Sequence, residues 1–208
     1  MCGIKTTILS TATPSGDLKF TFQYRTVNIK DVLLYVEQHK FNELCKSGCL
    51  NYGKKWSCPP FTPSFEQYTN SYKYLSVCVL SINLSQFFYI KNDYLKVKAA
   101  NIILKSRIDK VLRFLSQYSD SYISTGSCRL CNPCKCKMHK ECAKPDIMSY
   151  SFEALGVDVD FMVMSLFQHK LLWYKKGNLP EYTSVVAGLL SDEIIDDSAL
   201  LNTLKKYN

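Results

Sequence analysis

Residues Cys128–Cys142 read C-R-L-C-N-P-C-K-C-K-M-H-K-E-C, and this stretch holds five of the ten cysteines in the chain. Its only large apolar side chains are Leu130 and Met138, so packing alone cannot give the stretch a shape. Cysteine thiolates bind metal ions and metal clusters, and ligand bonds can order a loop that has no core. We therefore expect a metal or a metal cluster to hold this loop, with the rest of the chain arranged around it.

The spacing Cys128-x2-Cys131-x2-Cys134 lets three thiolates converge on one centre. It is the start of the bacterial ferredoxin pattern, in which a fourth cysteine completes the ligands of an iron–sulfur cluster. Cys142, which is followed closely by Pro145, is one candidate for the fourth ligand, and Cys136 is its competitor.

Disulfide bonds are the alternative use of these cysteines, and they need an oxidising compartment. Residues Met1–Thr13 contain one lysine and no apolar run of signal-peptide length, so we expect a cytoplasmic protein. Disulfide-stapled domains are also usually much shorter than 208 residues. Metal ligation is therefore the favoured interpretation.

A second cysteine group lies upstream and reads Cys45-K-S-G-Cys49-L-N-Y-G-K-K-W-S-Cys58-P-P. Its glycines permit tight turns, and the two prolines that follow Cys58 end any regular element. Like the downstream group, this group places several cysteines in a loop with few apolar side chains, which favours metal ligation. Three unrelated buried thiols are the alternative. We expect Trp56 to cover this upstream group and to exclude water from it.

Together the two groups resemble an uncharacterised family of predicted metal-binding proteins, the domain of unknown function 2284. The resemblance covers about residues 40–190 and rests on the motifs Cys45-x3-Cys49, Tyr52-Gly53, Trp56-x-Cys58-Pro59-Pro60, Gly126-x-Cys128-Arg129-Leu130-Cys131-x2-Cys134, Cys142-x2-Pro145 and Ser151-x-Glu153-Ala154-Leu155-Gly156-Val157-Asp158-Val159. It implies metal binding, and Cys136 is additional to the family pattern.

The candidate ligands of a metal or cofactor are seven cysteines, with Cys136 as an alternative: Cys45, Cys49, Cys58, Cys128, Cys131, Cys134 and Cys142. One or two clusters, of the 4Fe-4S type, fit this set. One cluster can take four thiolates and the other three, which leaves an iron open to substrate, or the two groups can exchange ligands as in two-cluster ferredoxins. Two zinc sites would need eight ligands, and Cys136 could supply the eighth, so zinc stays an alternative.

Strands are predicted at 18–27, 74–84, 122–124 and 182–190, and helices at 29–46, 63–72, 94–118, 158–175 and in the tail after 191. Asn28 and Asp158 are the expected caps of two of these helices. Residues 1–17 show no strong periodicity. The order predicts one α/β or α+β domain over residues 1–208, in which helices flank a mixed sheet. The cysteine-rich loops at 45–60 and 126–146 are its cluster-binding parts.

The apolar side chains define the expected buried faces. The strand at 18–27 should bury Leu18, Phe20, Phe22 and Tyr24, the helix at 29–46 should bury Val32, Leu33, Val36, Phe41 and Leu44, and the helix at 94–118 should bury Leu95, Val97, Ile102, Ile103, Ile108, Val111, Leu112 and Leu115. Cys78 lies in the middle of an apolar strand and is expected in the core, and neither Cys78 nor Cys2 is expected to be a ligand.

The net charge of +8 raises the question of nucleic acid, but the lysines are scattered and form no stripe with interleaved aromatics. No apolar run reaches membrane-spanning length. Basic residues do surround the downstream loop: Arg129, Lys135, Lys137, Lys140 and Lys144. They can offset an anionic thiolate cluster and dock an acidic redox partner, and a solvated basic loop is the alternative.

Three acids follow the downstream loop, namely Glu153, Asp158 and Asp160. They can relay protons or bind substrate, or they can be ordinary helix caps and first-turn acids. We expect an iron–sulfur protein with a redox role, either electron transfer or cluster-based reduction of a small substrate at an open iron. The alternatives are a non-redox cluster enzyme, with the open iron as Lewis acid or sulfur carrier, and a zinc-stabilised interaction module. Whether the protein is an enzyme stays open.

Overall fold

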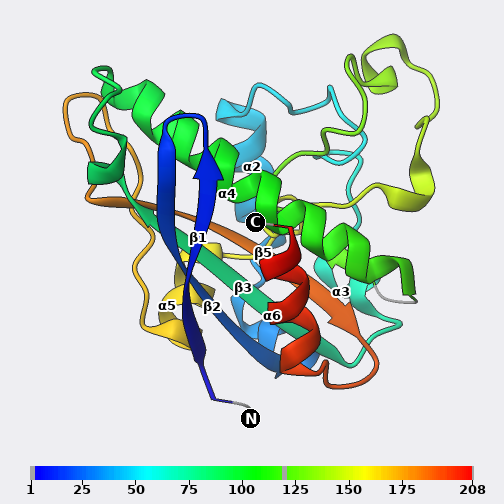
Figure 1. The fold of residues 1–208 in the computed structure, drawn as a ribbon. Coiled ribbons are helices and arrows are strands. Elements are labelled where there is room, and N and C mark those ends of the chain that lie inside the picture. Colours follow the sequence, from blue (N-terminus) through cyan, green and yellow to red (C-terminus); the bar gives the residue numbers. More distant parts are fainter. Residues whose placement is uncertain (1–2, 119–120, 208) are drawn as a thin grey trace.

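The computed structural model describes residues 3–118 and 121–207, which form one five-stranded sheet with helices on both faces (Figure 1). The strand order is β1-β2-β3-β5-β4. The strands are β1 Lys5–Thr13, β2 Gly16–Asn28, β3 Tyr74–Asn83, β4 Ser121–Ile123 and β5 Tyr182–Ser191, and the helices are α1 Ile29–Val32, α2 Gln38–Gly48, α3 Phe65–Thr69, α4 Asp93–Leu115, α5 Val159–Phe167 and α6 Asp197–Lys206. The predicted fold class is confirmed, with one difference: neighbouring strands of the described sheet all pair antiparallel, whereas we expected a mixed sheet.

The central strand β3 separates two hydrophobic cores. Cys78 and Leu80 pack into the core on one face of the sheet, and Val77 and Val79 pack into the core on the other. Because helices cover both faces, β3 is buried along most of its length, which explains its continuous apolar sequence. The prediction of a central strand with Cys78 in the core is confirmed.

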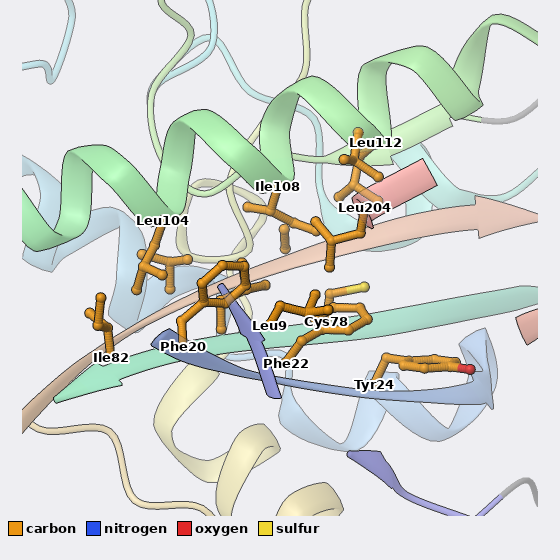
Figure 2. Packing of buried hydrophobic residues seen from close by; sticks show 14 of the residues in the cluster. Leu9, Phe20, Phe22, Tyr24, Cys78, Ile82, Leu104, Ile108, Leu112 and Leu204 are labelled. Atoms are coloured by element: carbon orange, nitrogen blue, oxygen red, sulfur yellow. The ribbon is translucent and has the colours of Figure 1, made fainter. Parts of the chain in front are cut away.

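The first core lies between the sheet and the helices α4 and α6 (Figure 2). The predicted face of β2 is confirmed, because Leu18, Phe20, Phe22 and Tyr24 are all buried. The predicted face of α4 is partly wrong, because Leu95 and Ile102 are about half exposed. The helix instead buries Ala100 and Leu104 beside Val97, Ile108, Val111 and Leu112. Apolar side chains occupy a wider face of α4 than the sheet can cover, so Leu95 and Ile102 stay partly exposed.

The second core lies on the opposite face, beneath α5, α3 and the segment that leads into α5. Figure 1 shows α5 behind the sheet and α4 and α6 in front of it. Phe152, Leu155 and Val157 belong to this core, and they precede α5 directly. The chain therefore leaves the downstream cysteine loop and enters a packed layer within a few residues.

The helix predicted at 29–46 is interrupted. It divides into α1, a 3-10 turn at Leu33–Tyr35 and α2, with Val36 in an extended conformation between them. Val36 forms a β-bridge with Val157, and the Glu37 amide donates to the Gly156 carbonyl at 2.8 Å. Pairing with this distant segment replaces helical hydrogen bonds that the local sequence would allow. Asn28 makes no side-chain cap, and of the expected buried stripe Val32 is buried whereas Leu33 and Leu44 are exposed.

Two further expectations need correction. Residues 5–13, which we left without regular structure, form the edge strand β1, and its outward Ile8 is 71% exposed. The helix predicted at 158–175 ends at Phe167, because Gln168 takes a left-handed conformation with φ of 53°. The cap at its start is confirmed, since Asp158 accepts a hydrogen bond from the Phe161 amide at 3.0 Å. Within residues 3–118 and 121–207, none of the helices combines the length and apolar character needed to cross a bilayer.

Candidate metal centre

The two cysteine-rich loops lie side by side, away from the two hydrophobic cores, where Figure 1 shows the cyan and yellow-green segments together. Ser57 Oγ accepts a hydrogen bond from the Cys128 amide at 2.9 Å, and Lys55 Nζ donates to the Cys128 carbonyl at 2.9 Å. Trp56 Nε1 donates to the Lys140 carbonyl at 3.0 Å. The two loops therefore lean on each other. Side chains of the upstream loop thus satisfy backbone groups that the downstream loop leaves open.

The upstream cysteines form what we call the three-cysteine site: Cys45, Cys49 and Cys58. Cys45 lies in the last turn of α2, and the Cys49 amide donates to the Cys45 carbonyl at 3.0 Å, so these residues are one helical turn apart. The loop then folds back, with Gly53 at a φ of 64° and its amide donating to the Pro59 carbonyl at 2.9 Å. This turn brings Cys58 to the cavity that Cys45 and Cys49 line.

The cavity of the three-cysteine site has a volume of about 200 Å³. Its walls also carry polar side chains: Asn51, Tyr52, Ser127, Ser151 and Glu153. Three thiols cannot complete a four-ligand set, so a metal centre held here would keep one position for another ligand. The polar groups lie on the same cavity, which makes it suited to a polar fourth ligand.

The downstream cysteines form the four-cysteine site: Cys128, Cys131, Cys134 and Cys142. They line a second, much tighter cavity of about 10 Å³, together with Trp56, Leu130 and Met148. Cys142 Sγ lies 3.9 Å from Met148 Sδ. The expectation that Trp56 covers the upstream group is wrong: its ring lines the four-cysteine cavity, because its indole hydrogen bond ties it to the downstream loop.

The other cysteines are placed differently. Cys136 is 4% exposed, and its thiol points at the Gly53 carbonyl, 3.9 Å away. It lines neither thiol cavity and contacts the upstream loop instead. Cys78 is fully buried in the sheet, with its thiol 3.7 Å from the Ser76 carbonyl. Cys2 lies outside the described residues.

Without a cation, burial disfavours the thiolate form of Cys45, Cys58 and Cys128. Burial raises the pKa of Cys58 to about 11, and the neighbouring thiols add to this effect, whereas Ser57 and Lys55 oppose it. Burial also raises the pKa of Cys45, with smaller contributions from Cys49 and Glu153. Cys128 has a raised pKa for the same reason, reinforced by Cys142, Cys131 and Cys134. A bound cation would reverse this preference by stabilising the thiolates.

The nine described cysteines are all free thiols. Among the described residues, no group of three or more His, Cys, Asp or Glu side chains has the spacing to hold a single metal ion. None of the described histidines lines either thiol cavity. The candidate donors are therefore the thiols, with the carboxylate of Glu153 beside them in the three-cysteine cavity, and they would have to move closer together to hold a single metal ion.

The three acids after the downstream loop have different surroundings. Asp158 is the cap of α5 and pairs with Lys40 at 2.9 Å, and Asp160 accepts from Trp173 Nε1 at 3.1 Å. Their structural interpretation is confirmed for Asp158. Glu153 lines the three-cysteine cavity and also two neighbouring cavities. It is the acid best placed to act at this site.

Lys105 was not among the predicted site residues, yet it faces the downstream loop from α4. Residues Asn101, Lys105 and Asp109 are spaced at i, i+4 and i+8, so they form a polar stripe on one face of the helix. Asp109 accepts hydrogen bonds from the Thr125 amide at 3.0 Å and from its hydroxyl at 2.9 Å, which fixes the start of the downstream loop. The stripe was visible in the sequence, but nothing there tied it to the cysteines.

A family model described as "Predicted metal-binding protein (DUF2284)" matches residues 28–190. No curated protein matches the chain, and no solved structure does either. The matched span contains both thiol sites, Lys105 and Glu153, and it leaves out β1, all of β2 except Asn28, and α6.

Proposed function

Since the chain belongs to this family of predicted metal-binding proteins, DUF2284, we propose that its metal is iron and that both thiol sites hold iron–sulfur clusters with a redox role. The four-cysteine site would hold a 4Fe-4S cluster through Cys128, Cys131, Cys134 and Cys142. The three-cysteine site would hold a second cluster through Cys45, Cys49 and Cys58. The spacing of the downstream cysteines and their free thiols support this assignment.

The observation that carries the proposal is the division of seven thiols between two cavities. Four line one cavity and three line the other, and no thiol is shared. A four-thiol set completes a cluster, whereas a three-thiol set leaves one iron for an outside ligand. Bound clusters supply electron transfer, and an open iron adds a place for a small substrate.

The residues around the two sites would give them different roles. Trp56 and Met148 cover the tight four-cysteine site and exclude water from it, which suits an electron relay. The wider three-cysteine site exposes Glu153 and several hydroxyl and amide groups to a ligand. We therefore propose that electrons enter at the four-cysteine site and that reduction of a small molecule takes place at the three-cysteine site.

The basic residues of the downstream loop support an acidic redox partner. Arg129, Lys135, Lys137, Lys140 and Lys144 are all exposed, and they surround the four-cysteine site in sequence. Positive charge there offsets a thiolate cluster and speeds encounter with an acidic surface. We propose no nucleic-acid partner and no membrane partner, and we place the protein in the cytoplasm because thiolate ligands need a reducing compartment.

A non-redox role is the second candidate, and the wide cavity beside Glu153 favours it over a purely electron-carrying protein. In that role the open iron would act as a Lewis acid, or the cluster would carry sulfur. A zinc module is less well supported, since Cys136 lines neither cavity and cannot serve as an eighth ligand where it lies.

The test is the metal content of anaerobically purified protein. We expect brown protein with about eight iron and matching acid-labile sulfide per chain, and bleaching on reduction with dithionite. Cys131→Ser and Cys49→Ser should each remove about half of the iron, since they lie in different sites. Colourless protein with zinc would overturn the proposal. Clusters that no mild reductant or oxidant changes would select the non-redox role.

A further inference from the structure

A cavity of about 330 Å³ lies between α4, β5 and the segment after α5, next to the three-cysteine site. Ligand pockets of this size are typically apolar with a few placed polar groups. Its apolar and aromatic walls include Tyr94, Val97, Phe152, Leu171, Trp173, Tyr174 and Val185. Its polar groups include Asn101, Lys105, Thr125, Glu153 and Thr183. The cavity is therefore a largely apolar chamber whose wall carries one cation, Lys105, and one carboxylate, Glu153.

Lys105 is a cation without a hydrogen-bonded partner, although the carboxylates of Glu153 and Asp109 lie near enough to interact with its charge. In the part of the chain that the structure describes, its ammonium makes no hydrogen bond and no ion pair within 4.0 Å. Its natural partner on α4 is Asp109, but both Asp109 oxygens accept from Thr125. The ammonium lies next to the downstream loop, since a Cβ at Gly126 would lie 3.4 Å from Nζ. Burial and the nearby Arg129 lower the pKa of Lys105, and the carboxylates of Glu153 and Asp109 oppose this shift without cancelling it.

Asn101 adds a second donor on the same face of α4, one turn before Lys105. Its amide oxygen accepts a hydrogen bond from the Thr183 hydroxyl at 2.9 Å. This bond fixes the amide and leaves its nitrogen without a partner among residues 3–118 and 121–207. An ammonium and an amide N–H2 on one wall form a site for a small anion.

The cavity communicates with the three-cysteine site through Glu153. Its side chain lines the large cavity, the three-cysteine cavity and the groove beside Cys45, Cys49 and Trp173. Two short segments of chain separate the cavities. Thr125 and Phe152 line the large cavity, and Ser127 and Ala154, two residues further along each segment, line the three-cysteine cavity. A molecule bound in the chamber would therefore lie one wall away from the thiols.

We propose that this chamber binds a small organic carboxylate with an apolar body, its carboxylate on Lys105 and Asn101 and its body against the aromatic wall. Naming it a substrate of the three-cysteine site rests on the function proposed above, whereas binding itself does not. One cation and one amide match a single carboxylate and not the several charges of a nucleotide. The apolar walls exclude a free inorganic anion as the preferred ligand, because it would leave them unfilled.

The test is isothermal titration calorimetry on the full-length, anaerobically purified chain, with iron measured on each sample. Phenylacetate and 4-methylvalerate are the probes, and their neutral amides are the controls. We expect the acids to bind at least about tenfold more tightly than the amides, since an ammonium–carboxylate contact is a charge-assisted bond. Lys105→Met should remove that preference. Lys98→Met, an exposed position on the same helix, should keep it.

The outcomes separate the two proposals. If neither acid binds, or if acid and amide bind equally to the unchanged protein, the carboxylate site is wrong whatever the iron content. If Lys105→Met is folded by circular dichroism and keeps the preference, the assignment to Lys105 is wrong. If that variant fails to fold, the comparison of acid and amide binding to the unchanged protein still tests whether the chamber prefers a carboxylate. If the acids bind to anaerobically purified protein that contains no iron, the cluster proposal is wrong and the carboxylate site is supported.

Discussion

At the scale of single residues, Cys142 and Cys136 compete for one ligand position, and the structure places their thiols differently. Cys142 lines the four-cysteine cavity, whereas Cys136 is directed at the Gly53 carbonyl. We expect Cys142→Ser to lose about half of the iron per chain and Cys136→Ser to keep it. Iron and sulfide analysis of the two proteins side by side checks this. Full iron in Cys142→Ser, with loss in Cys136→Ser, would exchange their roles, and full iron in both would refute a four-cysteine site.

Cys78 offers a matched control because it is buried without being near either thiol site. Burial strongly raises the pKa of its thiol, so it stays neutral in the core. We expect Cys78→Ala to leave the metal content unchanged and to lower the free energy of unfolding by about 1 kcal/mol, the usual size of a small core deletion. Metal analysis and denaturant unfolding measure the two effects. Loss of a full equivalent of metal would contradict the assignment.

At the scale of elements, Asp158 ties α5 to α2. It caps α5 through the Phe161 amide and pairs with Lys40 at 2.9 Å. Burial would raise the pKa of Asp158, but the Phe161 amide and Lys40 outweigh it and lower the pKa. A lowered pKa in the folded state stabilises the protein above the unfolded pKa of about 3.9, and this contribution is lost as the pH falls through the folded value.

We therefore expect Asp158→Ala to lower the free energy of unfolding at neutral pH by about 1 kcal/mol, the usual cost of losing a cap. Asp158→Asn keeps a good cap and loses only the charge, so its deficit should be smaller. That deficit should shrink further as the pH falls below about 4, where the native carboxylate is protonated as well. Urea unfolding of the three proteins at pH 7 and at low pH measures this. A deficit of Asp158→Asn that grows on acidification would contradict it.

The same elements show what the sequence can and cannot predict. β2, β3 and β5 were predicted because each alternates or runs apolar against a covered face. The prediction of one continuous helix at 29–46 was wrong because Val36 pairs with Val157. A local sequence pattern cannot indicate a partner more than about a hundred residues away. The grouping of the cysteines in two loops could be read from the sequence, and which of them bind metal stays a prediction. The positions of Trp56 and Lys105 could not be read from it, since both depend on how the loops cross in three dimensions.

At the scale of the whole molecule, the two hydrophobic cores and the downstream cysteine loop are stabilised nearly independently of each other. Within residues 126–150, Cys136 and Ser149 are buried, and every other side chain is exposed or half-buried. Neither hydrophobic core draws a fully buried residue from this range. The sheet and its helices therefore have their own apolar stabilisation, whereas the loop depends on hydrogen bonds to residues 51–57 and on whatever the thiols bind.

This separation predicts a local response to metal removal. Ordering residues 126–150 costs conformational entropy with little apolar burial to offset it, so ligand bonds must supply much of the stabilisation. We expect hydrogen exchange across 126–150 to rise at least about tenfold in protein stripped by a chelator, because the loop opens on its own. The amides of β3 and β5 should stay protected. Cys131→Ser should reproduce the pattern without chelator, and Cys78→Ala should not. Uniform loss of protection through the sheet would mean that the metal holds the whole fold, and unchanged exchange at 126–150 would mean that the loop does not depend on it.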